Sequence, residues 1–306
     1  MIIVRINGGL GNQLFQYATA RSIAYKLNRK LFVDNSWYKD IEKLDDHSNS
    51  NATTKRDFLL QKLNIESQVL NPFYLNWVKR LEVKAPSNRF FSFLKRYPLN
   101  SLSYTAINQM NYSWELIANS KKVVLTGYWQ NDDIIEDYRD SIISECKPKQ
   151  PISKENNHYL KSICSSNSVA LHFRRGDYVS KPLSRKVHAV CSNNYYYKGI
   201  ELLHKTVKDL RFFIFSDDLR WVKNNFGFNE NVIYISNEGP EFEHLYLMSQ
   251  CKHQITANST FSWWAAWLNN NPEKIVITPE YWYYDKKLNK TIIRIPKNWI
   301  KINNLI

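Results

Sequence analysis

Two consecutive arginines, Arg174 and Arg175, follow a short apolar run at residues 169–173. The run is typical of a buried strand, whose end reaches the carboxyl edge of a sheet, where open α/β proteins bind their ligands. A guanidinium group holds a phosphate through two parallel hydrogen bonds and does not lose its charge. The pair therefore predicts an anion site, with a surface network to Asp177 and neighbouring acids as the alternative.

A glycine-rich turn, GGLGN at residues 8–12, follows a β-branched strand at residues 2–6 and precedes a helix with an apolar side. Glycine lets the backbone approach a ligand, and the start of the helix offers unpaired N–H groups. The segment lacks both the lysine of a phosphate-binding P-loop and the full spacing of a dinucleotide fingerprint. A tight structural turn is therefore equally compatible with it.

A third segment, ANSTFSWWAAWL at residues 257–268, places small hydroxyl residues at the start of an aromatic helix. Asn258, Ser259 or Thr260 can cap that helix, and the same groups can instead receive a phosphate. Capping is the default interpretation. We expect the three tryptophans of the helix to be mainly packing residues.

The elements that position these residues form two halves. In the first, we expect strands at 2–6 and 123–126 and a helix at about 132–146, closed by Pro148 and Pro151. In the second, strands at 169–173, 211–215, 232–235, 254–256 and 275–278 alternate with helical stretches. Such alternation predicts a parallel sheet with helices on both faces. We therefore divide the chain into domains 1–150 and 151–306, and allow for the C-terminal tail packing back on the first.

Four ordered segments resemble the bacterial α-1,2-fucosyltransferases, inverting sugar transferases that use GDP-fucose. They are GGLGNQLFQ at residues 8–16, HFRRGDY at 172–178, FSDD at 215–218 and NSTFSWW at 258–264. Residues 128–130 and 188–192 are also similar to family segments, though they are less specific. The resemblance spans nearly the whole chain. It implies an α/β fold of the GT-B type, with two Rossmann-like domains facing each other across a cleft.

The resemblance also implies the chemistry. The 2-hydroxyl of a terminal β-galactose displaces GDP from GDP-β-L-fucose, and the inversion gives an α-1,2 linkage. We assign Arg174 to the β-phosphate. Consecutive strand residues point to opposite faces, so Arg175 either contacts the donor as well or instead holds Asp177. The donor would contact Gly9, Gly11, Asn12, His172, Arg174, Arg175, Asp217, Asp218, Glu243, Asn258, Ser259 and Thr260. The acceptor would contact Trp129, Gln130 and His188.

The general base stays open at this stage. Asp177 and His188 are candidates because each can accept the proton of a sugar hydroxyl, whereas Asn12 can only orient it. Late release of the proton without a dedicated base is also possible. The acidic residue that the family resemblance predicts at position 244 is His244 here, so either Glu243 replaces it or a nucleoside contact is lost.

No Asp-x-Asp triplet occurs in the chain, so we expect no metal cofactor, with fixed cations in its place. The four cysteines show no metal-like pairing, and we expect buried thiols. The net charge of +14 lacks a nucleic-acid-binding motif beside it. Much of it lies in basic residues of segment 79–96, interleaved with aromatic residues from Trp77 to Tyr97, which could contact an anionic membrane and a lipid-linked acceptor.

The apolar stretches are far shorter than a membrane span, and no leader precedes the first strand, so we expect a cytoplasmic protein, either free or peripheral on the inner face of the plasma membrane. Two other functions remain open. One is a fucosyltransferase of another linkage, α-1,6 or protein O-fucosylation. The other is a non-catalytic protein that binds a nucleotide sugar or glycan.

Overall fold

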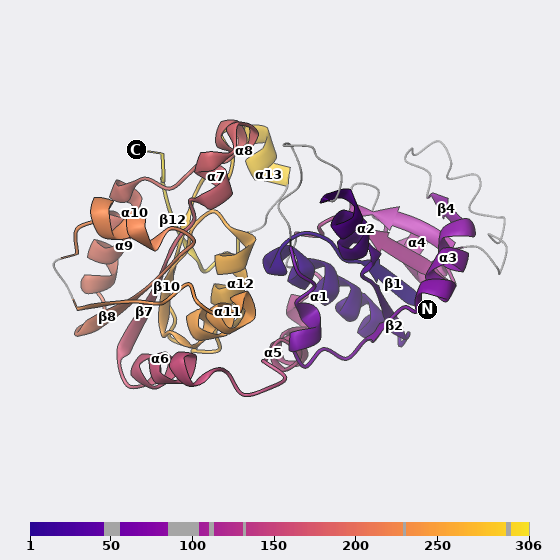
Figure 1. Ribbon diagram of the computed structural model, residues 1–306, viewed down its shortest axis with the longest axis horizontal. Helices are drawn as coiled ribbons and strands as arrows, with labels where there is room; N and C mark the ends of the chain where they lie inside the picture. The colour runs from indigo at the N-terminus through magenta and orange to yellow at the C-terminus, as the bar shows by residue number, and fades with distance from the viewer. Residues whose placement is uncertain are drawn as a thin grey trace. The chain divides into compact units, whose positions relative to one another are not determined.

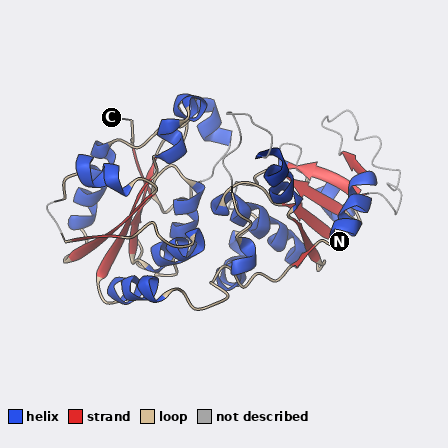
Figure 2. Cartoon of the chain, in the orientation of Figure 1, coloured by secondary structure: helices blue, strands red, loops and turns tan. Residues whose placement is uncertain are grey.

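The computed structural model describes residues 1–45, 56–84, 104–109, 113–130, 133–228, 231–291 and 295–305. The chain divides into two compact units, Met1–Glu145 and Cys146–Ile306. Each contains one sheet, and helices and strands alternate along the chain (Figure 2). The polar loop at residues 48–54 and the basic aromatic segment beyond residue 84 lie outside the described residues.

The first unit has a six-stranded sheet in the order β3-β2-β1-β6-β5-β4, in which every pair is parallel. Its strands are β1 (Ile2–Arg5), β2 (Leu31–Asp34), β3 (Gln68–Val69), β4 (Glu82–Lys84), β5 (Tyr104–Asn108) and β6 (Val123–Thr126). Its α-helices are α1 (Leu10–Lys26), α2 (Ser36–Asp45), α3 (Pro72–Arg80), α4 (Trp114–Asn119) and α5 (Arg139–Glu145), with 3₁₀ turns at Leu60–Lys62 and Glu136–Tyr138.

Two expectations for this unit need correction. The predicted helix at 132–146 is shorter, because a turn and a 3₁₀ segment precede α5; such tighter turns are common at helix starts. Helix α1 is buried on almost every side, including the polar Gln13, Gln16, Thr19 and Ser22, so it is not a helix with one apolar face.

The second unit has a six-stranded, wholly parallel sheet in the order β12-β11-β10-β7-β8-β9. Its strands are β7 (Asn167–Phe173), β8 (Leu210–Ser216), β9 (Val232–Tyr234), β10 (His253–Ile255), β11 (Val276–Pro279) and β12 (Ile300–Ile302). Its helices are α6 (Lys154–Cys164), α7 (Gly176–Ser180), α8 (Pro182–Val187), α9 (Asn193–His204), α10 (Leu219–Asn225), α11 (Glu241–Gln250), α12 (Thr260–Leu268) and α13 (Lys286–Thr291). The predicted parallel sheet is confirmed, and α9 and α10 lie on one of its sides while α11 and α12 lie on the other (Figure 1).

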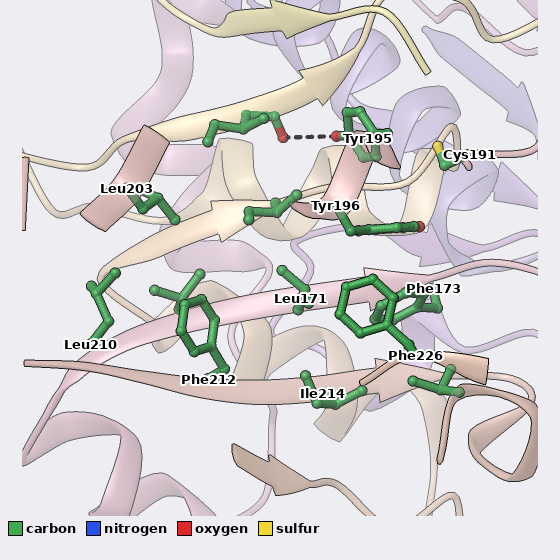
Figure 3. Packing of buried hydrophobic residues seen from close by; sticks show 14 residues of the cluster. Leu171, Phe173, Cys191, Tyr195, Tyr196, Leu203, Leu210, Phe212, Ile214 and Phe226 are labelled. Atoms are coloured by element: carbon green, nitrogen blue, oxygen red, sulfur yellow. Dashed lines mark hydrogen bonds between the residues drawn. The ribbon is translucent and has the colours of Figure 1, made fainter. Parts of the chain in front are cut away.

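An aromatic core fixes the end of β7. Figure 3 shows Phe173 and the neighbouring strand residues packed against Tyr196 and Phe226. The rings of Phe173 and Tyr196 stack 4.0 Å apart, and the Tyr196 hydroxyl donates to the carbonyl of His172 at 2.9 Å. The last residues of β7 are thus held rigidly, which is what a ligand site at its end requires.

The tryptophans and cysteines complete the comparison with the sequence. Trp263, Trp264 and Trp267 are buried in α12, so their predicted packing role is confirmed. Three of the four thiols are buried, but Cys164 is exposed at the end of α6, so the expectation of buried cysteines is wrong there. Residues up to 305 belong to the second unit, where β12 pairs with β11.

Candidate functional site

The predicted residues of the second unit gather at a point where the strand order reverses. β7 lies between β10 and β8, and the chain leaves β7 toward β8 and leaves β10 toward β11, in opposite directions. The segments that follow β7 and β10 therefore meet at a topological switch point, where open parallel sheets bind their ligands. In register, Phe173 of β7 lies beside Ser216 of β8, so Asp217 arrives at the same edge.

Arg174 is held at this edge between two carboxylates. Its Nη2 donates to Asp177 Oδ1 at 2.6 Å, and its Nη1 lies 2.8 Å from Asp217 Oδ2. Burial alone would lower the pKa of Arg174, but Asp217 and Asp177 outweigh burial and raise it. The side chain keeps 20% of its surface exposed. The network with Asp177 that the sequence allowed is therefore present, and it fixes a permanently charged donor that still reaches solvent.

Gly176 makes this arrangement possible. A Cβ atom at Gly176 would lie 2.5 Å from Asp217 Oδ2, well inside the closest approach that real Cβ atoms make. Any side chain there would displace the carboxylate that holds Arg174. Gly176 is thus needed because it lets the Asp217 carboxylate approach the backbone closely, and not because the backbone is left-handed there.

Arg175 turns away from its neighbour. Its guanidinium carbon lies 3.3 Å from the centroid of the Trp221 ring, and its backbone N–H donates to Asp217 Oδ1 at 2.9 Å. Burial lowers the pKa of Arg175, although Asp218 and Asp217 oppose this. The structure pairs Asp177 with Arg174 and places the Arg175 guanidinium on the Trp221 ring. The different orientation of the two arginines is confirmed, and phosphate contact by Arg175 stays a prediction.

The two neighbouring carboxylates have different roles. Asp217 binds both arginines, as described above. Asp218 caps α10, since its Oδ1 accepts the N–H of Trp221 at 2.9 Å and its own N–H donates to Ser216 Oγ at 2.9 Å. Their contacts with guanine or ribose remain predictions.

His172 is a neutral, buried imidazole. Burial, helped by the charge of Arg174, lowers its pKa to about 3. Its ring lies 5.8 Å from that of Phe261, and its Nδ1 has no hydrogen-bond partner among the described residues. An unsatisfied buried nitrogen beside a charged site is uncommon. It is compatible with the predicted donor contact and adds no positive charge to the site.

His188 lies in an aromatic stack. Its ring is parallel to that of Tyr178 at 4.0 Å and tilted against Tyr283 at 5.3 Å. Burial lowers the pKa of His188, Asp177 opposes this effect and Arg174 reinforces it. The imidazole is therefore neutral at pH 7 and can accept a proton. Both candidate bases, Asp177 and His188, thus lie in the second unit around Arg174.

Segment 258–260 begins α12 at the switch point. Ser259 caps the helix by accepting the N–H of Phe261 at 3.3 Å, so the default capping interpretation is confirmed. Asn258 is fully buried, and its Nδ2 donates to the carbonyl of Trp282 at 3.1 Å. The Tyr178 hydroxyl donates to the carbonyl of Asn258 at 3.2 Å. Asn258 thus joins the ends of β7 and β10, while phosphate contact by Ser259 and Thr260 stays a prediction.

Glu243 is bound to the start of α6. Its buried Oε2 accepts hydrogen bonds from the N–H and hydroxyl of Ser153, at 3.1 and 2.8 Å, and from Asn156 Nδ2 at 2.6 Å. Contact of Glu243 with the donor stays a prediction. Burial lowers the pKa of His244, so a neutral imidazole stands where the family resemblance predicts an acid.

In the first unit the candidate residues follow β1 and β6, which lie side by side in the sheet. There Gln130 Nε2 donates to Asn12 Oδ1 at 3.0 Å, so the structure brings these two candidates together. Gly8 has a φ of +77°, and a Cβ atom there would lie 3.0 Å from Asn12 Nδ2. Gln13 Nε2 and the Tyr38 hydroxyl both donate to the Gly8 carbonyl, at 3.1 and 2.9 Å. The glycine turn is therefore tightly held by neutral amide and hydroxyl groups, and the Arg56 side chain lies beside Gly9.

Trp129 departs from its predicted role. It is 5% exposed and has a φ of +54°, which is rare for a large side chain. Its N–H donates to Gln109 Oε1, which holds the strained turn. The neighbouring Tyr128 is 45% exposed and is the more accessible of the two rings.

Sequence reasoning missed Tyr128, Trp221 and Tyr283. Trp221 and Tyr283 are distant in sequence from the residues that they contact, so no local spacing could reveal them. Tyr128 was adjacent to a chosen residue, and the left-handed conformation of Trp129 inverts which of the two rings faces outward.

The described residues also bear on metals and membranes. Their His, Cys, Asp and Glu side chains nowhere gather in groups of three or more that could hold a metal ion. Their helices are all too short or too polar to cross a bilayer.

Comparison with known proteins identifies the class to which this fold and site belong. FUT1 of Arabidopsis thaliana, solved in complex with GDP, has a TM-score of 0.51 at 12% identity over 90% of this chain and 70% of its own. That likeness shows the fold, a GT-B glycosyltransferase fold with two Rossmann-like units. The chain matches Glycosyl transferase family 11 over residues 1–303 and belongs to that family.

Two full-length relatives agree with this assignment. The O-antigen biosynthesis glycosyltransferase WbnK of Escherichia coli is 33% identical, with 97% of this chain and 99% of WbnK covered. The alpha-1,2-colitosyltransferase of Escherichia coli is 32% identical, with 99% of each chain covered. The protein is therefore a glycosyltransferase.

Proposed function

We propose that the protein transfers L-fucose from GDP-β-L-fucose to the 2-hydroxyl of a terminal β-galactose, in the synthesis of a surface polysaccharide such as an O-antigen. The observation that carries this proposal is Arg174, held at a topological switch point with its charge fixed and part of its surface open. A diphosphate leaving group needs such a preorganised cation. The names of the two full-length relatives support the linkage and the pathway.

The reaction needs one bond made, one broken and one proton moved. The acceptor oxygen bonds to the anomeric carbon on the face opposite the phosphate, and the bond from that carbon to the phosphate oxygen breaks with its electrons on GDP. Arg174 stabilises the charge that develops on the diphosphate. The N–H groups at the start of α12 do the same.

The proton of the acceptor hydroxyl goes to a base of the second unit. His188 meets the requirement because burial keeps its imidazole neutral. Asp177 meets it when the donor phosphate replaces it at Arg174. Replacing each with a residue that cannot accept a proton, His188→Phe and Asp177→Asn, separates them, since loss of the base removes the acidic limb of the pH–rate profile.

We further propose that no divalent metal takes part. Support comes from the arginine at the switch point and from the missing Asp-x-Asp triplet. Transfer is expected to be the same with and without excess chelator. Loss of turnover in chelator, restored by magnesium or manganese, would contradict the proposal.

A second donor is favoured by one comparison. The relative that is 32% identical is an alpha-1,2-colitosyltransferase, and colitose is fucose without one hydroxyl group. A site that hydrogen-bonds that hydroxyl discriminates strongly against a sugar that lacks it. Comparing GDP-fucose with GDP-colitose therefore identifies the donor.

The deciding experiment incubates the purified chain with each donor and a panel of β-galactosides, and determines the linkage of any product by NMR. The expected product is α-1,2-fucosylated galactose, absent with Arg174→Ala. A product of α-1,6 linkage, a fucosylated peptide, or GDP binding without any transfer would each overturn the proposal. We also propose that the natural acceptor is lipid-linked and that the protein works at the inner face of the plasma membrane, without nucleic acid as a partner.

A further inference from the structure

Two consecutive helices beside the candidate site have no buried residue. These are α7 and α8, which contact each other and carry Val179, Leu183 and Val187 on their outside. Their exposed fractions are 38, 79 and 42%, and that of the adjacent Tyr284 is 52%. Leu183 and Val187 are four positions apart in α8 and share one face. We call these four residues the α7–α8 surface.

The four residues belong to one region. The N–H of Tyr284 donates to the carbonyl of Val187 at 3.1 Å, and His188 pairs with Tyr283 in an antiparallel bridge. Helix α13 begins two residues after Tyr284, and Figure 1 shows α7, α8 and α13 together. Exposed apolar residues that gather in this way mark an interaction site more often than single ones do.

The charge around the α7–α8 surface is positive. Its cations are Lys181, Arg185, Lys186, Lys286 and Lys287. The acids of the same stretches, 176–188 and 284–291, are Asp177 and Asp285. Asp177 is paired with Arg174, and Asp285 Oδ1 accepts the N–H of Lys287 at 2.7 Å as α13 begins. Cations outnumber acids in these two stretches, so the surface suits an anionic partner.

We propose that the α7–α8 surface docks on an anionic phospholipid bilayer. Aliphatic side chains ringed by lysine and arginine match the boundary between acyl chains and acidic headgroups. Nucleic acid matches the charge but offers no acyl region for Leu183. This inference rests on the proposed function, because an enzyme acting on a lipid-linked acceptor must meet its substrate at such a boundary.

The chain places the docking surface beside the catalytic groups. Val179 follows Tyr178, and Val187 precedes His188, so residues of the site and of the surface alternate along the same segment. Tyr178 and His188 are stacked on each other at 4.0 Å. A lipid-linked acceptor whose lipid lies in the bilayer at α8 would thus have its sugar within reach of the site.

A rival surface exists on α3 of the first unit, where Phe73 is 86% exposed. Trp77, its neighbour on the helix, packs against Tyr74 at 5.6 Å and under Lys122 at 5.5 Å. The exposed apolar residues of α3 are Phe73 and Trp77, the latter 39% exposed, whereas the α7–α8 surface joins four apolar residues from three segments. This difference makes Phe73 a matched control.

The test measures sedimentation of the full-length chain with vesicles of phosphatidylcholine alone or mixed with phosphatidylglycerol. We expect binding to the anionic vesicles only. Leu183→Ser should weaken it by roughly tenfold, because a buried leucine contributes that much to partition. Replacing Arg185 and Lys186 together by glutamate should abolish it at moderate salt. Phe73→Ser should bind like the native chain, and GDP affinity and melting temperature verify that each variant is folded.

Four outcomes would overturn the inference. They are native binding by Leu183→Ser, loss of binding by Phe73→Ser instead, equal binding to neutral vesicles, and a native dimer that Leu183→Ser converts to monomer, which would make the surface an interface between copies. The vesicles carry neither donor nor acceptor. Failure here therefore leaves the transferase assay to decide the proposed function separately.

Discussion

At the edge between β1 and β6 the first unit presents glycines and amides, whereas between β7 and β10 the second presents arginines, a histidine and carboxylates. Both edges lie at the carboxyl ends of neighbouring parallel strands, but the strand order reverses only at the second. In the first, Asn12 and Gln130 bind each other and the turn is held by uncharged donors. In the second, Arg174 is held by Asp177 and Asp217.

We infer from this difference that the two parallel sheets bind different substrates. A diphosphate needs fixed positive charge, which Arg174 supplies at the second edge. A sugar hydroxyl needs neutral groups that orient it without competing for the phosphate, and the amides of the first edge suit that task. We therefore assign the diphosphate to the second edge and expect Asn12 of the first, for which the sequence predicted donor contact, to act mainly on the acceptor.

The largest effect is expected from Arg174→Ala, which removes the guanidinium group that we assign to the diphosphate leaving group. Transfer should fall by at least about 10²- to 10³-fold, as for other preorganised donors at a developing anion. Arg174→Lys should fail as well, because an ammonium group cannot copy the bidentate fork. Near-normal turnover in a folded variant, measured by product formation, would refute the role of this arginine.

Gly176→Ala tests whether the carboxylates position Arg174. The new Cβ would displace Asp217, which lies 2.5 Å from its position. We expect kcat to fall by about tenfold, the effect of losing one ion-pair contact of about 1.4 kcal/mol. Gly227→Ala is the matched control, because no atom lies within 4 Å of a Cβ there. Equal activity of the two variants would show that the position of Asp217 is unimportant.

Asn12→Ala tests the edge between β1 and β6, which we call the neutral edge because Asn12 and Gln130 are uncharged. We expect kcat to fall by about tenfold, because a lost neutral hydrogen bond contributes about 1 kcal/mol or somewhat more. Gln130→Ala should behave similarly, since its amide orients Asn12. Tyr128→Ala should raise the acceptor KM severalfold, and Trp129 should matter for stability more than for the acceptor. Steady-state kinetics with the acceptor varied would show this, and an unchanged acceptor KM in Tyr128→Ala would contradict it.

The smallest effect concerns His172 and pH. Its folded pKa of about 3 lies below its usual 6.5, so between these values the unfolded chain binds more protons. Stability from this group is complete above pH 6.5 and declines as the pH falls, by at most about 1.4 kcal/mol per pH unit. His172→Gln should therefore flatten the dependence of the melting temperature on pH between 6.5 and 4. An unchanged slope would mean that His172 is not a buried neutral base.

The sequence predicted the second unit well and the first poorly, for a physical reason. Strands such as β7 and β8 are continuous apolar runs, because helices cover both faces of a parallel sheet. In the first unit, β2 to β5 are short or flanked by polar residues, so their hydrophobic pattern was not decisive. Arg174 and Asp177 lie three residues apart, so their ion pair could be predicted from the sequence. The contacts of Arg175 with Trp221 and of Glu243 with Ser153 join distant segments, and only the fold brings those together.

Titration of GDP into the native chain, Arg174→Ala and Asn12→Ala tests the division between the two edges most directly. Calorimetry should show GDP affinity reduced about 10- to 100-fold in Arg174→Ala, as expected for a lost charged hydrogen bond. Asn12→Ala should stay within about twofold of the native value, since a change of roughly 0.4 kcal/mol is no larger than that of an ordinary surface substitution. If Asn12→Ala loses GDP while Arg174→Ala retains it, the donor binds at the neutral edge and the account is wrong.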